Sequence, residues 1–164
     1  MDTTSIAGIL AGLFAELTLG APQGGAFILN TSDPGLLASL DGLTAAEASD
    51  AAQGGATIAA HAMHVRYGLS LMNRWATESG DPFADAHWQD AWRIGRVDED
   101  RWQEIRNGLR HEVLRWEKTL HTPRDVRNME LSGMIGSVAH TAYHLGAIRQ
   151  IASKARGPKD PSPR

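Results

Sequence analysis

The apolar positions of this chain recur every three or four residues over long stretches, which is the pattern of amphipathic α-helices. Residues 3–19 form the first such stretch, which Thr3 or Thr4 can cap and which turn residues 20–22 end. Its apolar positions are Ile6, Ile9, Leu10, Leu13, Phe14 and Leu17. Turn residues surround the run 26–29, and we expect this run to be no more than a short apolar plug.

A second long helix is expected to end at about Glu78. Thr44-Ala45-Ala46-Glu47 has the pattern of a capping box, and Gly54-Gly55 mark either the true start of this helix or a kink in it. Before the capping box, a short helix is predicted from four leucines, Leu36, Leu37, Leu40 and Leu43.

Asp81-Pro82 begins a crossover that leads to a third helix, whose N-terminus carries the acidic residues 98–100. This helix has an unbroken apolar stripe, formed by Trp102, Ile105, Leu109, Val113, Trp116 and Leu120, and residues 121–123 end it. A fourth helix is predicted from about Asn128 to Lys154, burying Leu131, Met134, Ile135, Val138, Leu145, Ile148 and Ile151.

Four long helical stretches with little sign of strand predict an all-α fold, and the simplest arrangement is a four-helix bundle. With 164 residues, 42% of them hydrophobic, the chain has the size and the apolar content of one domain. We assign this domain to residues 1–155, and expect the Pro-rich tail 156–164 to be mobile and without catalytic function.

Charge and composition narrow the possible functions. The stretch Ile6 to Leu19 contains Glu16 and has no basic region before it, so we expect a core helix, no membrane association and a cytoplasmic protein. No Lys or Arg precedes Arg66, and the later arginines alternate with acids, so nucleic acid is not an expected partner. The chain has no cysteine, so any thiol in its chemistry must come from a substrate.

His140 and His144 are the strongest candidates for chemistry, because residues four apart stand on one face of a helix and can bind one metal ion. A candidate third ligand is His64. It lies seven residues after Thr57, as His144 lies seven residues after Ser137, and a β-branched residue follows each hydroxyl residue. The two segments are expected to form facing helices of one site, with neutral imidazole suited to zinc, nickel, copper or ferrous iron.

These residues resemble the DinB/YfiT-like superfamily of small helical proteins, which carry one histidine on the second helix and a His-x-x-x-His pair on the last. A glycine commonly follows that pair, as in His144-Leu145-Gly146. The resemblance extends from the first helix through Ile151. It implies a four-helix bundle with a divalent metal ion, zinc or nickel, held by His64, His140 and His144. One departure is Ala147, where many members have glutamine, so the role of that amide is absent or falls to another residue such as Gln150.

The resemblance also implies an activity. Characterised relatives include metal-dependent S-transferases and isomerases that use low-molecular-weight thiols, so we expect a thiol S-transferase acting on a small electrophile, and a homodimer. No catalytic residue is assigned. Two alternatives remain open, namely a bundle that binds a small molecule or partner without catalysis, and a metal-dependent hydrolase.

Several other side chains could belong to the site. His61 lies three residues before His64 and is its rival as a ligand; otherwise we expect it to line the pocket. Trp75, Trp88 and Trp92 are candidates for the pocket wall, and Tyr143 could contact a substrate. The histidines expected to be at the surface or at helix ends are His87, His111 and His121.

Overall fold

The chain is all-α in the computed structural model, which describes residues 3–52, 54–78, 80–122 and 126–155. Within these ranges there is no β-strand, only two isolated β-bridges. The α-helices are α1 (Thr3–Leu19), α2 (Leu36–Asp41), α3 (Ala45–Ala48), α4 (Ile58–Thr77), α5 (Glu99–His121) and α6 (Asn128–Ile151), with short 3-10 turns η1 (Ala91–Arg93) and η2 (Ser153–Ala155). The all-α prediction is therefore confirmed.

Side-chain caps fix where the central helices begin. The Thr57 hydroxyl accepts a hydrogen bond from the Ala60 N–H at 3.1 Å and starts α4, and the Asp98 carboxylate accepts one from the Arg101 N–H at 2.8 Å and starts α5. The predicted capping box at Thr44 is present, but it opens the four-residue α3 and not a long helix. Of the two alternatives for Gly54-Gly55, the true start is therefore the better one, since α4 begins just after them.

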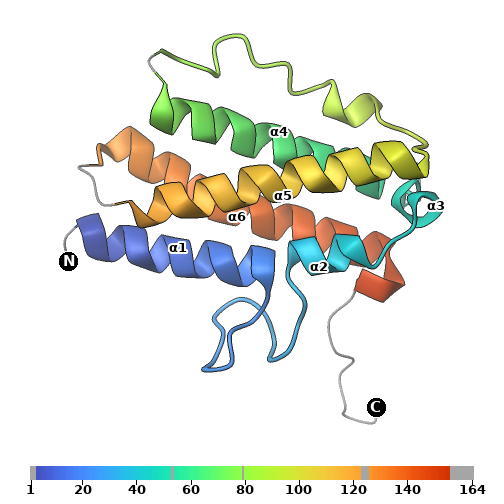
Figure 1. Cartoon of the computed structure of the whole chain (residues 1–164), viewed down its shortest axis with the longest axis horizontal. Coiled ribbons are helices and arrows are strands. Elements are labelled where there is room, and N and C mark those ends of the chain that lie inside the picture. The colour runs from blue at the N-terminus through green and yellow to red at the C-terminus, as the bar shows by residue number, and fades with distance from the viewer. Residues whose placement is uncertain (1–2, 53, 79, 123–125, 156–164) are drawn as a thin grey trace.

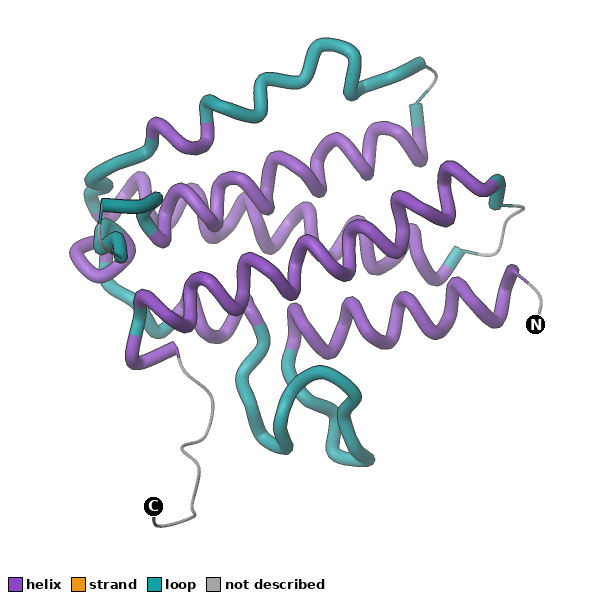
Figure 2. The backbone as a smooth tube through the Cα atoms, turned by 180° about the vertical axis from the view of Figure 1, so that it is seen from behind, coloured by secondary structure: helices purple, strands orange, loops and turns teal. Residues whose placement is uncertain are grey.

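The long helices lie side by side in two parallel pairs (Figure 1). α1 and α6 run in one direction, and α4 and α5 run in the other. α1 packs against α5 and α6, and α4 packs against the same two helices. Because α4 and α5 are parallel, the chain between them must return along the whole molecule, and residues 80–98 do so over the outer side of α4 (Figure 2). We call residues 80–98 the return segment.

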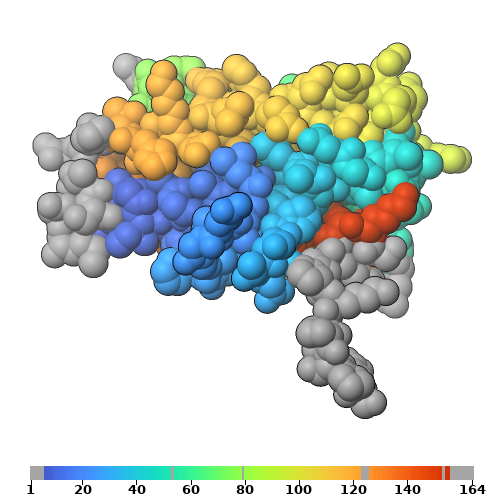
Figure 3. Space-filling model, turned by 60° about the horizontal axis from the view of Figure 1, so that its bottom comes forward, coloured from blue at the N-terminus to red at the C-terminus, as the bar shows by residue number. Residues whose placement is uncertain are grey.

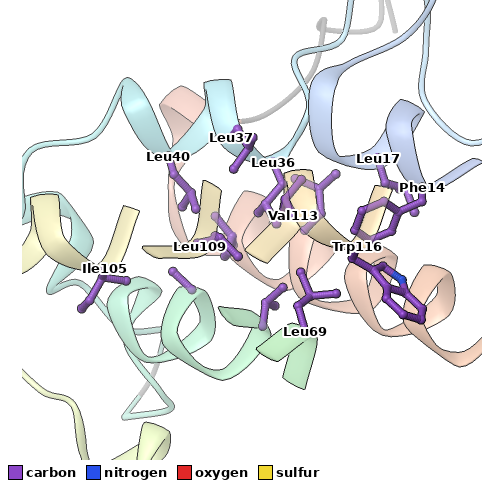
Figure 4. Packing of buried hydrophobic residues seen from close by; sticks show 14 of the residues in the cluster. Phe14, Leu17, Leu36, Leu37, Leu40, Leu69, Ile105, Leu109, Val113 and Trp116 are labelled. Atoms are coloured by element: carbon purple, nitrogen blue, oxygen red, sulfur yellow. The ribbon is translucent and has the colours of Figure 1, made fainter. Parts of the chain in front are cut away.

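The core lies where α1, α2, α4, α5 and α6 meet (Figure 4). The predicted stripe of α5 is confirmed, since all six of its residues from Trp102 to Leu120 are buried. Ile135 was expected to be buried and is not, and Ile9 of the apolar stretch in α1 also lies at the surface, since both are 51% exposed. Ile9 directly precedes the buried Leu10, and Ile135 directly follows the buried Met134. Adjacent residues of an α-helix point about 100° apart, so these two side chains lie outside the buried stripe. α6 also ends at Ile151, earlier than predicted, and η2 follows it.

The loop between α1 and α2 differs from its prediction as an apolar plug. Phe27 is 92% exposed and Ile28 is also exposed, and only Leu29 packs against the core. The backbone N–H groups of all three donate to the buried Glu16 carboxylate, at 3.0, 2.6 and 2.6 Å. Burial by itself raises the pKa of Glu16, but these three hydrogen bonds outweigh it and lower the pKa. Hydrogen bonds from the loop backbone to Glu16 thus hold the loop in place. The loop protrudes from the surface beside α1 (Figure 3).

The described helices include none that is both long and apolar enough to cross a membrane. The predicted mobile tail, residues 156–164, lies outside the described residues.

Candidate metal centre

Three imidazoles meet between α4 and α6. His64 projects from α4, and His140 and His144 project from successive turns of α6. The Nε2 atom of His140 lies 3.1 Å from Nε2 of His64 and 3.0 Å from Nε2 of His144. Taking one ring nitrogen from each residue, all three ligand atoms lie within 4.8 Å of one another. The structure thus brings together the three histidines that the sequence singled out.

This arrangement fits a divalent metal ion. Imidazole nitrogens lie about 2.0–2.1 Å from zinc, so two nitrogens on one ion are at most about 4.2 Å apart, and both short distances meet this limit. Hydrogen bonds satisfy the group poorly, because a neutral ring nitrogen carries either one proton or one lone pair, and Nε2 of His140 would have to share it between two other nitrogens. A cation that accepts a lone pair from each ring removes this conflict.

The imidazoles are neutral near pH 7, as metal ligands must be. Burial is the main cause, since His144 is 1% exposed and His64 is 8% exposed. Burial first, and repulsion from the neighbouring imidazoles second, lower the pKa of His144 to about 3 and that of His64 to about 4. A contact of His64 with the Trp88 backbone acts in the opposite direction. Burial also lowers the pKa of His61 and of His140.

His61 lies behind this group rather than in it. Its Nδ1 is 2.9 Å from Nδ1 of His144, whose other nitrogen faces His140. His61 is not among the residues that line the cavity described below. The geometry favours His64 over His61 as the third ligand, with His61 as the hydrogen-bond partner that orients His144.

The return segment covers the outer side of the histidines. The Trp92 ring stacks on His64, with ring centroids 4.3 Å apart and an angle of 25° between the planes, and it meets His61 edge-on at 5.4 Å. Trp88 lies 5.6 Å from His64. The sequence offered no local signal for these contacts, because they depend on the path of a segment without long helices.

A cavity of about 620 Å³ opens beside His140, between α4, α6 and the return segment. Of the three candidates for the pocket wall, Trp75 and Trp88 line it, whereas Trp92 does not and instead covers His64. Tyr143 is 69% exposed and lies edge-on to His144, outside the cavity lining. The volume is in the range of sites for small organic ligands.

The remaining candidates lie apart from the three-histidine group. The residues His87, His111 and His121 are exposed, as the sequence suggested. Gln150 is exposed on α6. That its side-chain amide takes the role of the glutamine absent at Ala147 stays a prediction.

No protein-family model, no curated protein and no solved structure matches this chain. The similarity to the DinB/YfiT-like superfamily therefore depends on the histidine spacing and the helix pattern alone.

Proposed function

We propose that this chain is a metal-dependent enzyme of the DinB/YfiT-like type, a four-helix bundle in which His64, His140 and His144 hold one divalent metal ion. The observation that carries the proposal is the position of His140 Nε2, within 3.1 Å of His64 Nε2 and 3.0 Å of His144 Nε2. Three neutral nitrogens from two facing helices are the ligand set of a catalytic site that keeps further positions open.

The reaction we propose is the transfer of a low-molecular-weight thiol to a small electrophile. A divalent ion, zinc or nickel by the resemblance, supplies a Lewis acid that lowers the pKa of a thiol. The chain contains no cysteine, so the thiol comes from a substrate and cannot come from the protein. The cavity beside His140 is the place for the electrophile, since its wall is mainly apolar and one of the proposed ligands lines it.

Other side chains hold this site in shape. His61 fixes the ring of His144 through the contact between their Nδ1 atoms. Trp92 covers one face of His64 and keeps water from that side of the imidazole. These contacts limit the rotation of two of the three proposed ligands.

Metal content is the first test. Protein purified without chelator is expected to contain about one divalent ion per chain, measured by plasma mass spectrometry, and His64→Ala, His140→Ala and His144→Ala are each expected to lose most of it. His87→Ala is the matched control, because this histidine is exposed and outside the group, and should keep the metal. Equal metal content in all four variants would refute the proposed ligand set.

Activity is the second test. Conjugation of a small thiol to an electrophile is measured with metal-loaded and chelator-treated protein, and only the loaded protein is expected to accelerate it. Turnover of an ester or amide without thiol would replace the transferase by a metal-dependent hydrolase. Full metal content with neither activity would favour a binding protein.

A further inference from the structure

The cavity beside His140 has an unusual combination of wall groups. Three aromatic side chains line it, Trp75 from α4 and Phe83 and Trp88 from the return segment. Ring centroids of Trp75 and Phe83 are 5.8 Å apart at 77°, and those of Phe83 and Trp88 are 6.4 Å apart at 13°. The rings therefore form one contiguous aromatic cluster that spans two sides of the cavity.

One carboxylate stands beside this cluster. Asp81 is the only acidic residue among the cavity-lining residues that the structure describes, and no Lys or Arg is among them. Its Oδ1 accepts a hydrogen bond from the Phe83 N–H at 2.9 Å, which fixes the carboxylate next to the aromatic cluster. Asp81 is exposed and makes no ion pair with a Lys or Arg in the described ranges, so a cationic ligand at the cavity mouth can reach its carboxylate.

One ring of this cluster, Trp75, packs against α6. A Cβ added at Gly133 would lie 2.7 Å from Cζ3 of Trp75 and 3.1 Å from Cε of Met72, so the indole rests directly against the α6 backbone. Glycine at this position is what allows the ring to approach so closely. The α6 backbone thus holds Trp75 in place on the cavity wall.

We propose that this cavity binds an organic cation, an ammonium or alkylated ammonium group carried on a small apolar body. Aromatic rings attract such cations through their negative faces, and a carboxylate adds direct charge pairing. Among the described lining residues Asp81 repels anions and no Lys or Arg offers them a partner, so the group that would attract an anion is the metal ion proposed at His140. His140, a proposed metal ligand, lines the same cavity, so the bound cation would be the electrophilic substrate of the proposed reaction. Only this assignment of the cation as substrate rests on the proposed function.

Calorimetric titration of the full chain after chelator treatment tests the inference without any turnover, because no metal ion at His140 is then present to bind a carboxylate probe. Three probes share a benzyl group, namely benzyltrimethylammonium, benzyl alcohol and phenylacetate. We expect the ammonium to bind about five- to tenfold more tightly than the alcohol, and phenylacetate to bind most weakly. Asp81→Asn is expected to weaken ammonium binding by about three- to fivefold and to leave the alcohol unchanged.

Asp85→Asn is the matched control, because Asp85 is an exposed acid of the same segment that does not line the cavity, and it should bind all three probes as the parent chain does. Trp75→Leu removes one ring of the wall and should weaken the ammonium more than the alcohol. Equal affinity for ammonium and phenylacetate, or full ammonium binding by Asp81→Asn, would overturn the inference.

The two proposals fail separately. Selective ammonium binding in a protein that catalyses no thiol transfer leaves the cation site in place and removes the transferase. Thiol transfer to neutral electrophiles, with no preference for cationic ones in binding, leaves the transferase in place and removes the cation site.

Discussion

Replacing His61 should weaken metal binding without abolishing it. If Nε2 of His144 gives its lone pair to a metal, Nδ1 of the same ring must carry the proton. The Nδ1 atom of His61, 2.9 Å away, is then the acceptor, and His61 keeps its own proton on Nε2. In His61→Ala the Nδ1–H group of His144 loses this acceptor. Because the His144 side chain is only 1% exposed in the parent chain, water has little access to replace the acceptor.

Loss of such an orienting partner typically lowers metal affinity by about 10–100-fold, which is about 1.4–2.7 kcal/mol at 25 °C. We therefore expect His61→Ala to bind one equivalent of metal with an affinity reduced within this range. His61→Asn places an amide oxygen near the position of Nδ1, so it should recover part of the loss. Competition against a fluorescent chelator measures both affinities, and His111→Ala, an exposed histidine of α5, serves as the control.

Two results would refute this reasoning. Unchanged affinity in His61→Ala would mean that the contact with His144 does not support the metal. Loss of stoichiometric metal in His61→Ala, with retention in His64→Ala, would mean that His61 is the third ligand and His64 is not.

Three further outcomes follow from the structure. Glu16→Gln should lower the free energy of unfolding by about 2–4 kcal/mol in urea denaturation, because an amide replaces the carboxylate that accepts three backbone N–H groups; an unchanged midpoint would contradict this. The metal-free protein should lose stability as the pH falls below 6.5 towards 4 and 3. The folded-state pKa values of His64 and His144 lie below the ordinary value, so the unfolded chain binds protons at a higher pH than the folded chain does. Urea midpoints that do not change over this pH range would contradict the prediction. Light scattering should give the mass of a homodimer at micromolar concentration, and a monomer mass independent of concentration would exclude one.

The sequence was enough to locate the helices and two proposed ligands on one helix face. Spacing of four residues places His140 and His144 together on any α-helix, and the shared outline around Thr57 and Ser137 pointed to His64. It could not show which ring of α4 meets them, because that depends on how α4 and α6 pack. Nor could it predict the contact of Trp92 with His64, since the return segment has no long helix from which a face could be read.

Phe27 shows a different limit. Its apolar character suggested burial, yet its side chain is 92% exposed while its backbone N–H bonds to Glu16. The N–H of Leu29 bonds to the same carboxylate and its side chain packs against the core, so the apolar character of a loop residue does not decide which side chain of the run is buried.

Because α4 and α5 are parallel, the proposed metal ligands and part of the cavity wall lie on two different kinds of structure, helices and an irregular segment. α4 has 20 residues and is therefore about 30 Å long, and the return segment has to span that length to begin α5 at the correct end. The three histidines belong to rigid helices of the core, whereas Asp81, Phe83 and Trp88 belong to the return segment outside it. The far end of the segment is tied to the core, since Ala91 is buried, Ile94 and Val97 pack against the core, and Trp92 stacks on His64. Substitutions at Asp81 or Phe83 are therefore expected to change which molecules the cavity admits with less effect on the imidazoles than substitutions at Trp92.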